Sequence, residues 1–520
     1  MPNIVDRLGW NPRTFSRELA KADIALAPLD ATSFSRGKCA HKLLQYAATK
    51  LPMVGNPVGA NAGALQCFSG ISAKSVDEWM DALIYLVSAS ADERAARGRH
   101  AAHQVAAHYF RRRMIGRMEG GGRNMALKGH GPRCRVAVVS TTIPRTVDGF
   151  YGQIIDTLKA DGYEVHVVTS DGPQVDRLRT RADIVHRIQM ARQIHLATDV
   201  RSFVSWISLL RRVRPQVILA GTPKAAFLGL AAAALTGVPT RGYFLQGLRL
   251  EGTRGLLRTV LGRMECLTSL CSQVIVAVSP SLAARFSDLG LTAGRPVVIP
   301  HHGSSHGVDS VFFSPRSPDE DLRRELSLDS VKCVVTFVGR LTADKGPDVL
   351  ITALEAIVAL GIRVQLLVVG AQDEPDSLAY VERMTASKVP MVLLDHVQDI
   401  RPYLALTDIL ALPTRREGMP NAVLEAAAMG VPSVTTDATG AVDSVIDGKT
   451  GLVVPVDDAY RLEVALVQLI EDEGMRRSMG NAARARVVRD FQPADVARAV
   501  VDAVVGTRAT STAPKRAVSC

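Results

Sequence analysis

The sequence predicts an α/β protein with two doubly wound, Rossmann-like domains, preceded by part of a third such domain. Its 520 residues, 47% of them apolar, suffice for about three domain-sized units with full cores. Between residues 134 and 490, short apolar strand patterns alternate with helical patterns, as in parallel sheets covered by helices. The opening residues also repeat, in order, segments from the far end of the chain.

The repeat defines a partial domain at residues 1–117. Three segments recur: residues 23–28 as 408–413, 47–54 as 427–434, and 92–110 as 472–491. The repeated part begins midway through a sheet, so we expect an unpaired strand edge, which favours aggregation. Gln45 stands where the later copy has Glu425, and Gly37 where it has Glu417. We therefore expect no catalytic activity from this segment alone.

A Gly-rich stretch at residues 118–133 predicts a flexible linker. Met125 lies within it, shortly after a run of Glu and Gly residues. Codons for Glu and Gly can form the purine-rich tract that positions a bacterial ribosome. The enzyme's own start is therefore expected either at Met1 or at Met125.

The first complete domain is predicted at residues 134–308. Its strands are expected at residues 135–140, 164–169, 216–220, 241–245 and 273–278. A helix at residues 150–160 should follow the first strand through a loop that contains Gly149. The loop after the fourth strand contains Gln246 and Arg249 and is expected to face a cleft, because ligands bind at the carboxyl ends of parallel strands.

The second complete domain is predicted at residues 309–490. Its strands are expected at residues 332–338, 364–369, 391–394, 409–412 and 433–436, with helices at 459–471 and 473–488. A last helix is expected at residues 491–505. The tail from residue 506 has no hydrophobic periodicity, which predicts disorder.

Two glutamates bracket the start of the helix that follows the strand at residues 409–412. Pro420 has a preset φ and no amide hydrogen, so we expect it at the first helical position, with Gly418, Met419 and Asn421 around the helix start. Free amides at a helix N-terminus attract phosphate. Glu425 lies further inside the helix, where its carboxylate can accept hydrogen bonds from a ribose diol, and Glu417 lies in the loop.

Two cations follow another strand end. The strand at residues 332–338 is followed by Gly339, Arg340 and Lys345. An arginine can contact phosphate through two nitrogens, and a lysine acts as a point charge. The sequence therefore predicts a site for a nucleotide diphosphate at this edge of the sheet.

These motifs resemble the glycosyltransferase family 4 enzymes, especially bacterial capsule and exopolysaccharide members. The family's Glu-x7-Glu motif matches Glu417 and Glu425, and its phosphate-binding cations match Arg340 and Lys345. The resemblance extends over roughly residues 134–505 and includes the turn at 303–309, with His306 where Asn is usual. It implies the two-domain GT-B fold, in which the final helix returns to the first domain.

The resemblance also implies a mechanism. A sugar would pass from a nucleotide diphosphate donor to a glycan or lipid-linked acceptor, with retention of configuration and without a metal or other cofactor. Arg340, Lys345 and Glu417 would be catalytic. The residues expected to bind the donor are Glu425, Gly339, Gly418, Met419, Pro420, Asn421 and Gly149. Gln246 and Arg249 are expected on the acceptor side, although related enzymes often have His at the position of Gln246.

The net charge of +11 favours anionic partners. We do not expect nucleic acid, because the basic residues are dispersed and no aromatic stacking motif accompanies them. Residues 201–212 place Phe203, Trp206, Ile207 and Leu210 on one helical face with arginines beside them, and residues 254–258 begin a similar segment. Such helices bind anionic membrane surfaces or pack on their own sheet.

Two other functions fit the same motifs. One is a nucleotide-sugar epimerase, which needs no acceptor, and the other is a non-catalytic scaffold, which the intact set of charged residues disfavours. The opening residues lack the pattern of a signal peptide, and seven scattered cysteines suggest reduced thiols. We therefore expect a cytoplasmic enzyme, either free or bound to the inner face of the plasma membrane.

Overall fold

The chain divides into two compact units, Met1–Gly131 and Pro132–Cys520. The computed structural model describes residues 22–28, 41–58, 60–108, 135–190, 195–329, 332–370 and 376–510. The linker predicted at residues 118–133, together with Met125, lies outside the described residues. Each unit has a hydrophobic core of its own.

The first unit contains a three-stranded parallel sheet in the order β1-β2-β3. Its elements are β1 (Ala25–Ala27), α3 (His41–Ala48), β2 (Met53–Gly55), α4 (Ala60–Cys67), β3 (Ile71–Ser72), α5 (Val76–Ser88) and α6 (Ala91–His108). Val76, Met80, Ile84 and Val87 are exposed and lie about one turn apart along α5. This helix therefore has an apolar stripe in contact with solvent.

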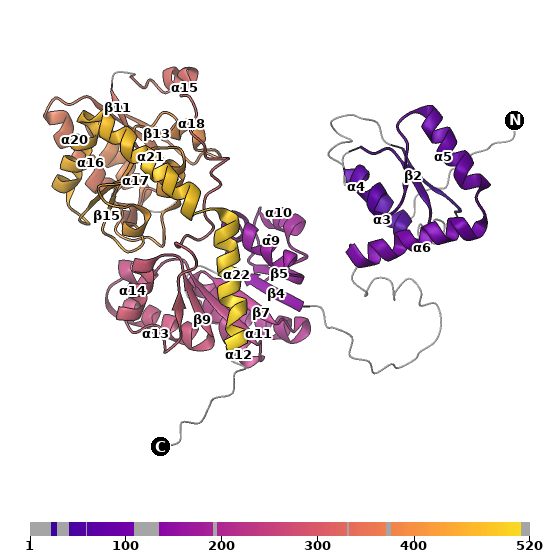
Figure 1. The fold of residues 1–520 in the computed structure, drawn as a ribbon. Coiled ribbons are helices and arrows are strands. Elements are labelled where there is room, and N and C mark those ends of the chain that lie inside the picture. Colours follow the sequence, from indigo (N-terminus) through magenta and orange to yellow (C-terminus); the bar gives the residue numbers. More distant parts are fainter. Residues whose placement is uncertain are drawn as a thin grey trace. The chain divides into compact units, whose positions relative to one another are not determined.

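The second unit contains two parallel sheets, both Rossmann-like (Figure 1). The first has the order β10-β9-β8-β7-β4-β5-β6. Its strands are β4 (Arg135–Ser140), β5 (Tyr163–Thr169), β6 (Ile184–Arg187), β7 (Val217–Gly221), β8 (Thr240–Leu245), β9 (Val274–Ala277) and β10 (Val297–Val298). Most of their residues are buried, because helices cover both faces of a parallel sheet. The two edge strands, β6 and β10, are short and only partly buried, and the apolar pattern did not predict them.

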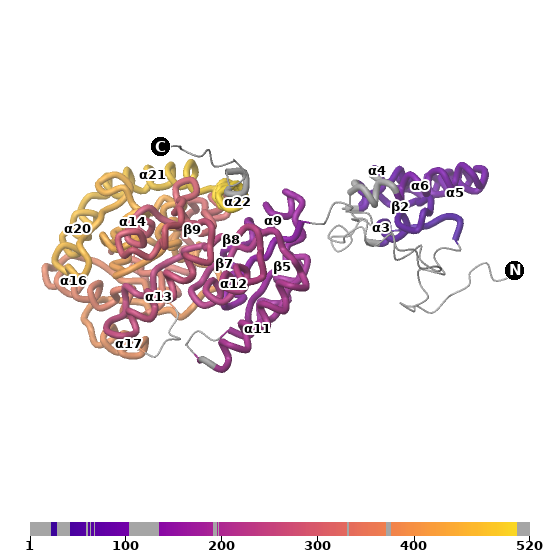
Figure 2. Tube along the Cα trace, turned by 90° about the horizontal axis from the view of Figure 1, so that it is seen from below, coloured from indigo at the N-terminus to yellow at the C-terminus, as the bar shows by residue number. Residues whose placement is uncertain are grey.

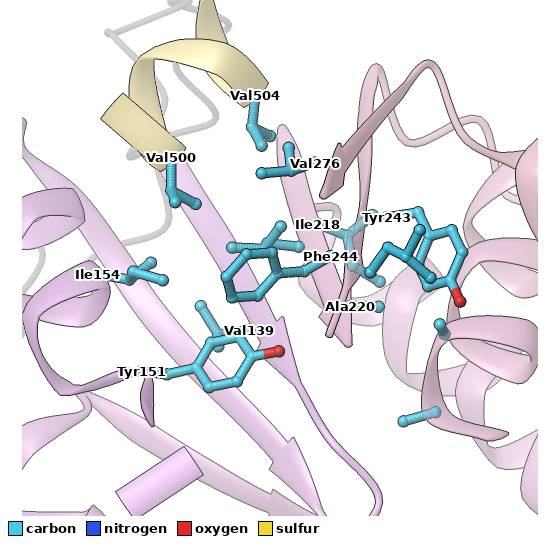
Figure 3. Close-up of a cluster of buried hydrophobic side chains, with 14 of the residues drawn as sticks. Val139, Tyr151, Ile154, Ile218, Ala220, Tyr243, Phe244, Val276, Val500 and Val504 are labelled. Carbon is cyan, nitrogen blue, oxygen red and sulfur yellow. The ribbon is translucent and has the colours of Figure 1, made fainter. Parts of the chain in front are cut away.

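Helices of this first domain connect its strands. They are α8 (Pro144–Phe150), α9 (Gly152–Ala160), α10 (Val175–Arg181), α11 (Leu196–Val213), α12 (Pro223–Leu235), the 3-10 turn η1 (Arg249–Gly252), α13 (Gly255–Cys271) and α14 (Pro280–Asp288). The helix predicted at residues 150–160 is confirmed as α9, which begins two residues later, whereas the predicted loop before it contains a further helix, α8, and the two helices meet at Tyr151. Tyr151 is fully buried against Phe244 of the sheet (Figure 3), so the break between the helices inserts a core side chain.

The second sheet has the order β13-β12-β11-β14-β15-β16. Its strands are β11 (Cys333–Val338), β12 (Val364–Val369), β13 (Met391–Leu394), β14 (Ile409–Leu412), β15 (Ser433–Thr436) and β16 (Gly451–Val454). The elements between and after them are α15 (Glu320–Glu325), η2 (Ala343–Lys345), α16 (Pro347–Ala359), α17 (Ser377–Thr385), α18 (Arg401–Leu404), α19 (Asn421–Ala428), η3 (Val442–Ser444), α20 (Ala459–Glu471) and α21 (Glu473–Asp490).

The final helix, α22 (Pro493–Thr510), packs on the first sheet, as the resemblance implies. It lies beside α9 in two views (Figure 1, Figure 2). Its residues Val500 and Val504 cover the sheet in the core, and a side chain on Gly242 of β8 would collide with Val504 (Figure 3). The helix continues to Thr510, beyond the predicted end at residue 505, and the rest of the tail lies outside the described residues.

The repeat is visible in the geometry of both units. Strands β1-β2-β3 are arranged as β14-β15-β16 are, parallel and in the same order. In the first unit a Cβ on Gly98 would lie 1.8 Å from the carbonyl oxygen of Lys50, and in the second a Cβ on Gly480 would lie 2.0 Å from that of Gly430. Lys50 and Gly430 both have positive φ. Both units therefore contain the same close contact, between a glycine of a helix and a turn that lies about 50 residues earlier in the chain.

Helix α11 corrects one interpretation of the basic segment at residues 201–212. Trp206 and Leu210 are fully buried, Phe203 and Ile207 pack against the same core, and the Trp206 ring lies against Gly229 of α12. The apolar face therefore packs on its own domain and is not available to lipid. None of the described helices is both long enough and apolar enough to cross a bilayer.

The division into units leads to a stability prediction. A truncated protein that starts at Met125 is expected to melt cooperatively at the temperature of the full chain's main transition, because unit Pro132–Cys520 has complete sheets. Residues 1–117 alone are expected to aggregate, since three short strands and an exposed apolar stripe bury little surface. Calorimetry and light scattering of both proteins test this. A cooperative, monomeric 1–117 fragment would contradict it.

Candidate functional site

Two adjoining cavities lie at the carboxyl ends of β11 and β14, where the first domain approaches the second. Their volumes are about 330 Å³ and about 380 Å³, and Gly339 lines both. The first is also lined by Lys345, Glu417 and the start of α19, and the second by Arg340 and Glu425. The structure thus brings the predicted charged residues to the sheet edge where ligands bind in open α/β folds.

In the first cavity, the Lys345 ammonium donates a hydrogen bond to Glu417 Oε1. Lys345 ends η2 and is followed by Gly346, whose φ of 67° is left-handed. A Cβ on Gly346 would lie 2.0 Å from the carbonyl oxygen of Pro413, so only glycine allows this loop to rest on the end of β14. This packing places the ammonium beside the Glu417 loop.

The second cation has an acidic neighbour. The side chain of Arg340 is 39% exposed, and Asp344 lies 4.0 Å from Arg340 and 3.2 Å from Arg416. Burial tends to raise the pKa of Asp344, but a hydrogen bond from Thr342 and the surrounding cations lower it below its usual value. Asp344 is therefore ionised, and it balances part of the positive charge at the cavity.

Gly418 lies where a loop of the second domain is in close contact with the first domain. A Cβ at this position would lie 2.0 Å from the backbone oxygen of Gln246 in the first domain. Pro420 is the N-cap of α19, with φ −73° and ψ 109°, and the helix begins at Asn421. Pro420 therefore precedes the first helical position that we predicted for it, because its ψ is extended. The amides at the helix start still line the first cavity, with Met419 and Ala422.

Glu425 lies on α19, one side of which is buried in the core. Its carboxyl group lines the second cavity, and its withdrawal from water raises its pKa to about 7. Glu417 forms an ion pair with Lys345, whereas Glu425 forms none with the residues that the structure describes. The group can therefore bind as a hydrogen-bond acceptor to a ligand without first breaking a salt bridge.

The raised pKa predicts a pH effect on stability. The folded state holds the Glu425 proton more tightly than the unfolded state, so ionisation of this carboxyl group lowers the free energy of unfolding. This loss of stability is absent below about pH 4.5 and complete above about pH 7. Glu425→Gln is therefore expected to raise the free energy of unfolding at pH 8 by up to about 3 kcal/mol, and to leave it unchanged at pH 4. Denaturant unfolding at both pH values measures this. Equal effects at both would contradict the assignment.

Gln246 projects from the end of β8 into the first cavity. Its Oε1 accepts a hydrogen bond from the Tyr151 hydroxyl at 3.3 Å, whereas its Nε2 is buried and has no partner in the described part of the chain. Asn421 Oδ1, which belongs to the same cavity lining, is likewise buried and unpaired there. One donor and one acceptor are thus available for the hydroxyl groups of a ligand.

Two of the predicted residues lie outside the lining of both cavities. Gly149 is in α8, and a Cβ there would meet no atom within 4 Å. Arg249 is an exposed residue of η1. Both follow strand ends of the first domain, as predicted, but neither contributes to the lining of a cavity.

Aromatic and basic side chains are among the cavity-lining residues that sequence reasoning missed. Phe150 lines the first cavity, and Phe312, His396 and Arg145 line the second. Arg145 Nη2 lies 2.8 Å from His396 Nε2, a contact between the two domains. His396 follows the end of β13, so the strand-end rule that identified Lys345 applies to it as well. No comparable signal marks Phe312, which belongs to the segment between the domains.

Comparison with protein families agrees with this geometry. Residues 150–302 match a model described as a glycosyl transferase 4-like domain, and residues 332–472 match a model of the group 1 glycosyl transferases. A capsular polysaccharide biosynthesis glycosyltransferase of Staphylococcus aureus, CapM, is 33% identical over 352 residues, which cover 67% of this chain and 91% of that protein. An Escherichia coli α-1,3-galactosyltransferase, named for UDP-Gal and a diphosphoundecaprenol-linked GlcNAc, is 25% identical over 65% of this chain and 88% of its own.

Solved structures share the fold. A sucrose-phosphate synthase from Thermosynechococcus elongatus has a TM-score of 0.60 at 18% identity and covers 73% of this chain and 100% of its own. The HepE protein of Anabaena, determined with UDP and glucose, has a TM-score of 0.58 at 20% identity and covers 73% of this chain and 99% of its own. At these identities the similarity concerns the fold alone.

Proposed function

The chain belongs to the glycosyltransferase family of the group 1 and 4-like domains, and from this membership we propose that it transfers a sugar from a nucleotide diphosphate donor to a glycan or lipid-linked acceptor in polysaccharide synthesis. One observation carries the proposal: each of the two cavities that share Gly339 is lined by one of the predicted cations and one of the predicted carboxylates, Lys345 and Glu417 in the first and Arg340 and Glu425 in the second. This arrangement suits a donor with a nucleoside at one end, a sugar at the other and a diphosphate between them.

In this proposal the second cavity takes the nucleoside, and Glu425 accepts hydrogen bonds from the ribose hydroxyls. Arg340 and Lys345 bind the diphosphate on either side of Gly339, with help from the amides at the start of α19. Glu417 orients the sugar hydroxyls in the first cavity, and Gln246 and Asn421 offer further hydrogen bonds. Gln246, expected on the acceptor side from the sequence, is thereby assigned to the sugar end of the donor.

The chemical role of the cations is electrostatic. Negative charge grows on the leaving diphosphate as the anomeric carbon becomes cation-like, so fixed positive charge stabilises the transition state more than the ground state. We assign the reaction to the retaining, metal-independent class, in which a phosphate oxygen of the donor receives the acceptor proton. Two cations at the cavities assigned to the donor support the electrostatic part of this assignment.

A donor screen tests the proposed function. The full chain is incubated with UDP-, GDP- and ADP-sugars, with an undecaprenyl-diphosphate sugar as acceptor, and nucleotide release is measured with and without EDTA. Acceptor-dependent release that EDTA leaves unchanged is expected. NMR of the product's anomeric proton then reports whether configuration is retained. Conversion of the donor to an epimeric nucleotide sugar without acceptor, and without nucleotide release, would support the epimerase instead; nothing in the relatives named above favours it.

We also propose that α13 holds the enzyme at an anionic membrane surface, on the cytoplasmic side, where lipid-linked acceptors are found. Leu256, Val260, Leu267 and Leu270 are exposed and follow one another along one face of this helix. Leu256 is 80% exposed, a high value for a leucine. Arg254, at the N-cap of the helix, and Arg263 are exposed near the stripe, whereas Arg258 is partly buried and donates to the carbonyl oxygen of Leu250. An apolar helix face with arginines beside it matches the chemistry of a lipid interface.

Membrane binding is expected to depend on this stripe. Replacing Leu256, Val260 and Leu267 with Asn should weaken binding to vesicles of anionic lipid by more than about tenfold, because each exposed apolar side chain loses roughly 1.5 to 3 kcal/mol of transfer free energy. Added salt should weaken binding of the unaltered protein. Vesicle sedimentation measures both effects.

A matched control uses exposed apolar residues of another helix. Val200→Asn with Val204→Asn on α11 removes similar exposed side chains and is expected to leave vesicle binding unchanged. Equal losses in both variants, or binding that is indifferent to salt, would exclude α13 as the attachment site.

A further inference from the structure

A cluster of polar contacts joins the two domains beside the first cavity, and we name it the domain latch: Glu251, Ser281 and Arg285 of the first domain with Thr439, Gly440 and Asp443 of the second. The Thr439 hydroxyl donates to Glu251 Oε1 at 2.9 Å, and Arg285 Nε donates to the same oxygen at 3.1 Å. The amide of Ser281 donates to Asp443 Oδ2 at 2.8 Å, and the amide of Gly440 donates to Ser281 Oγ at 2.7 Å.

The second-domain side of the latch is continuous with the Glu417 loop. The amide of Glu417 donates to the carbonyl oxygen of Thr439 at 2.8 Å. Gly440, with φ 77°, lies so close to the loop that a Cβ there would be 2.3 Å from the carbonyl oxygen of Gly418. Thr439 therefore contacts Glu251 through its side chain and Glu417 through its backbone.

The turn that carries the latch is fixed within its own domain. Arg486 of α21 donates to the carbonyl oxygens of Asp443 and Ser444, at 2.7 Å and 2.8 Å. The Asp443 carboxylate accepts a hydrogen bond from the Ser281 amide at the start of α14, where free amides attract negative charge. Because the turn is held on one side, a change in the separation of the two domains acts directly on the contacts of Glu251 and Asp443.

Glu251 itself has the features of a functional residue. Its side chain is only 13% exposed, and its Oε2 is buried without a hydrogen-bond partner in the part of the chain that the structure describes. Leaving half of a carboxylate unsatisfied costs stability. Glu251 lines neither cavity, so contact with the donor does not explain it.

We propose that Glu251 is a positioning residue: by binding Thr439 when the domains are closed, it fixes the backbone of Glu417 and Gly418 for transfer. This inference rests on the proposed function of Glu417. Domain closure and the geometry of the sugar end of the site are then coupled through one threonine, whose hydroxyl faces the first domain and whose carbonyl holds the loop.

The test compares variants that remove the contact between Glu251 and Thr439 with variants that keep it. Glu251→Ala and Thr439→Val each remove the contact, whereas Glu251→Gln and Thr439→Ser keep an acceptor and a hydroxyl. We expect the first pair to lower kcat roughly tenfold, as for loss of one hydrogen bond to a charged group, with the donor KM changed less than about twofold. The second pair should stay within about threefold of the unaltered enzyme. Glu251→Ala with Thr439→Val should be no slower than either alone.

Hydrogen exchange of the full chain gives a second reading that needs no activity. Glu251→Ala is expected to speed exchange of the Glu417 amide roughly tenfold, since that amide is held by Thr439. The control is Glu355→Ala, which removes a surface carboxylate paired with Arg383 and should change neither kcat nor this amide.

The outcomes separate the two proposals. An unaltered chain that transfers no sugar overturns the proposed function, while the exchange result still tests the latch. Normal transfer by Glu251→Ala, or equal losses in Glu251→Ala and Glu251→Gln, overturns the positioning role. Additive losses in the double variant also overturn it, because Glu251 and Thr439 would then act separately.

Discussion

Lys345→Ala is expected to lower kcat/KM for sugar transfer roughly 30- to 1,000-fold, the effect of losing about 2 to 4 kcal/mol of transition-state stabilisation. The ammonium lies beside Glu417 in the first cavity, where the proposal places the leaving diphosphate. Its loss also leaves the little-exposed Glu417 carboxylate without the ammonium that pairs with it. Steady-state kinetics with the donor identified in the screen measure the effect.

Lys388→Ala serves as the control, since Lys388 is an exposed lysine of the same domain that lines neither cavity. Its kinetics are expected to match those of the unaltered enzyme. Thermal melting of both variants shows whether the fold is retained. Near-normal turnover by Lys345→Ala with a cognate donor would show that the diphosphate binds elsewhere.

Gly418→Ala is expected to lower kcat/KM roughly 10- to 100-fold, although it adds only a methyl group. The new Cβ would lie 2.0 Å from the backbone oxygen of Gln246, so one of the two loops must move. Overpacking of this kind costs about 1 to 3 kcal/mol, and here the strain falls between the two domains at the first cavity. Kinetics and small-angle scattering together would report slower transfer and a more open protein.

Gly506→Ala is the matched control, because a Cβ at this helical position meets no atom within 4 Å. It should leave activity unchanged and slightly stabilise α22. If Gly418→Ala kept full activity, the close approach of the two loops would not be required for transfer.

Several of these features were predicted from the sequence because they depend on local patterns. The boundaries of β12, β13, β14 and β15 agree with the prediction, since each is a short run of apolar residues between polar turns. The strand-end rule likewise led to Lys345 and Glu417, which the structure brings into contact. A parallel sheet aligns its strand ends, so residues that follow those ends converge without further information.

Other features depend on contacts that no local pattern contains. The basic amphipathic segment around Trp206 fits a membrane helix or a core helix equally well, and only its packing on Gly229 distinguishes them. Phe312 and Arg145 line the second cavity together although they are far apart in the chain. The same is true of Thr439 and Glu251, which share a hydrogen bond. Gly149 and Arg249 follow strand ends as well, but they lie in helical turns outside the lining of both cavities.

The sequence alone determined the fold class, the repeat, and the residue types at each strand end, because hydrophobic periodicity and turn chemistry act over a few residues. The tertiary structure alone decided which surfaces became buried, how closely Gly418 and Gln246 approach, and that Glu425 has a raised pKa. Burial and electrostatics depend on the distances between elements, and those distances are set only when the two sheets and their helices pack together.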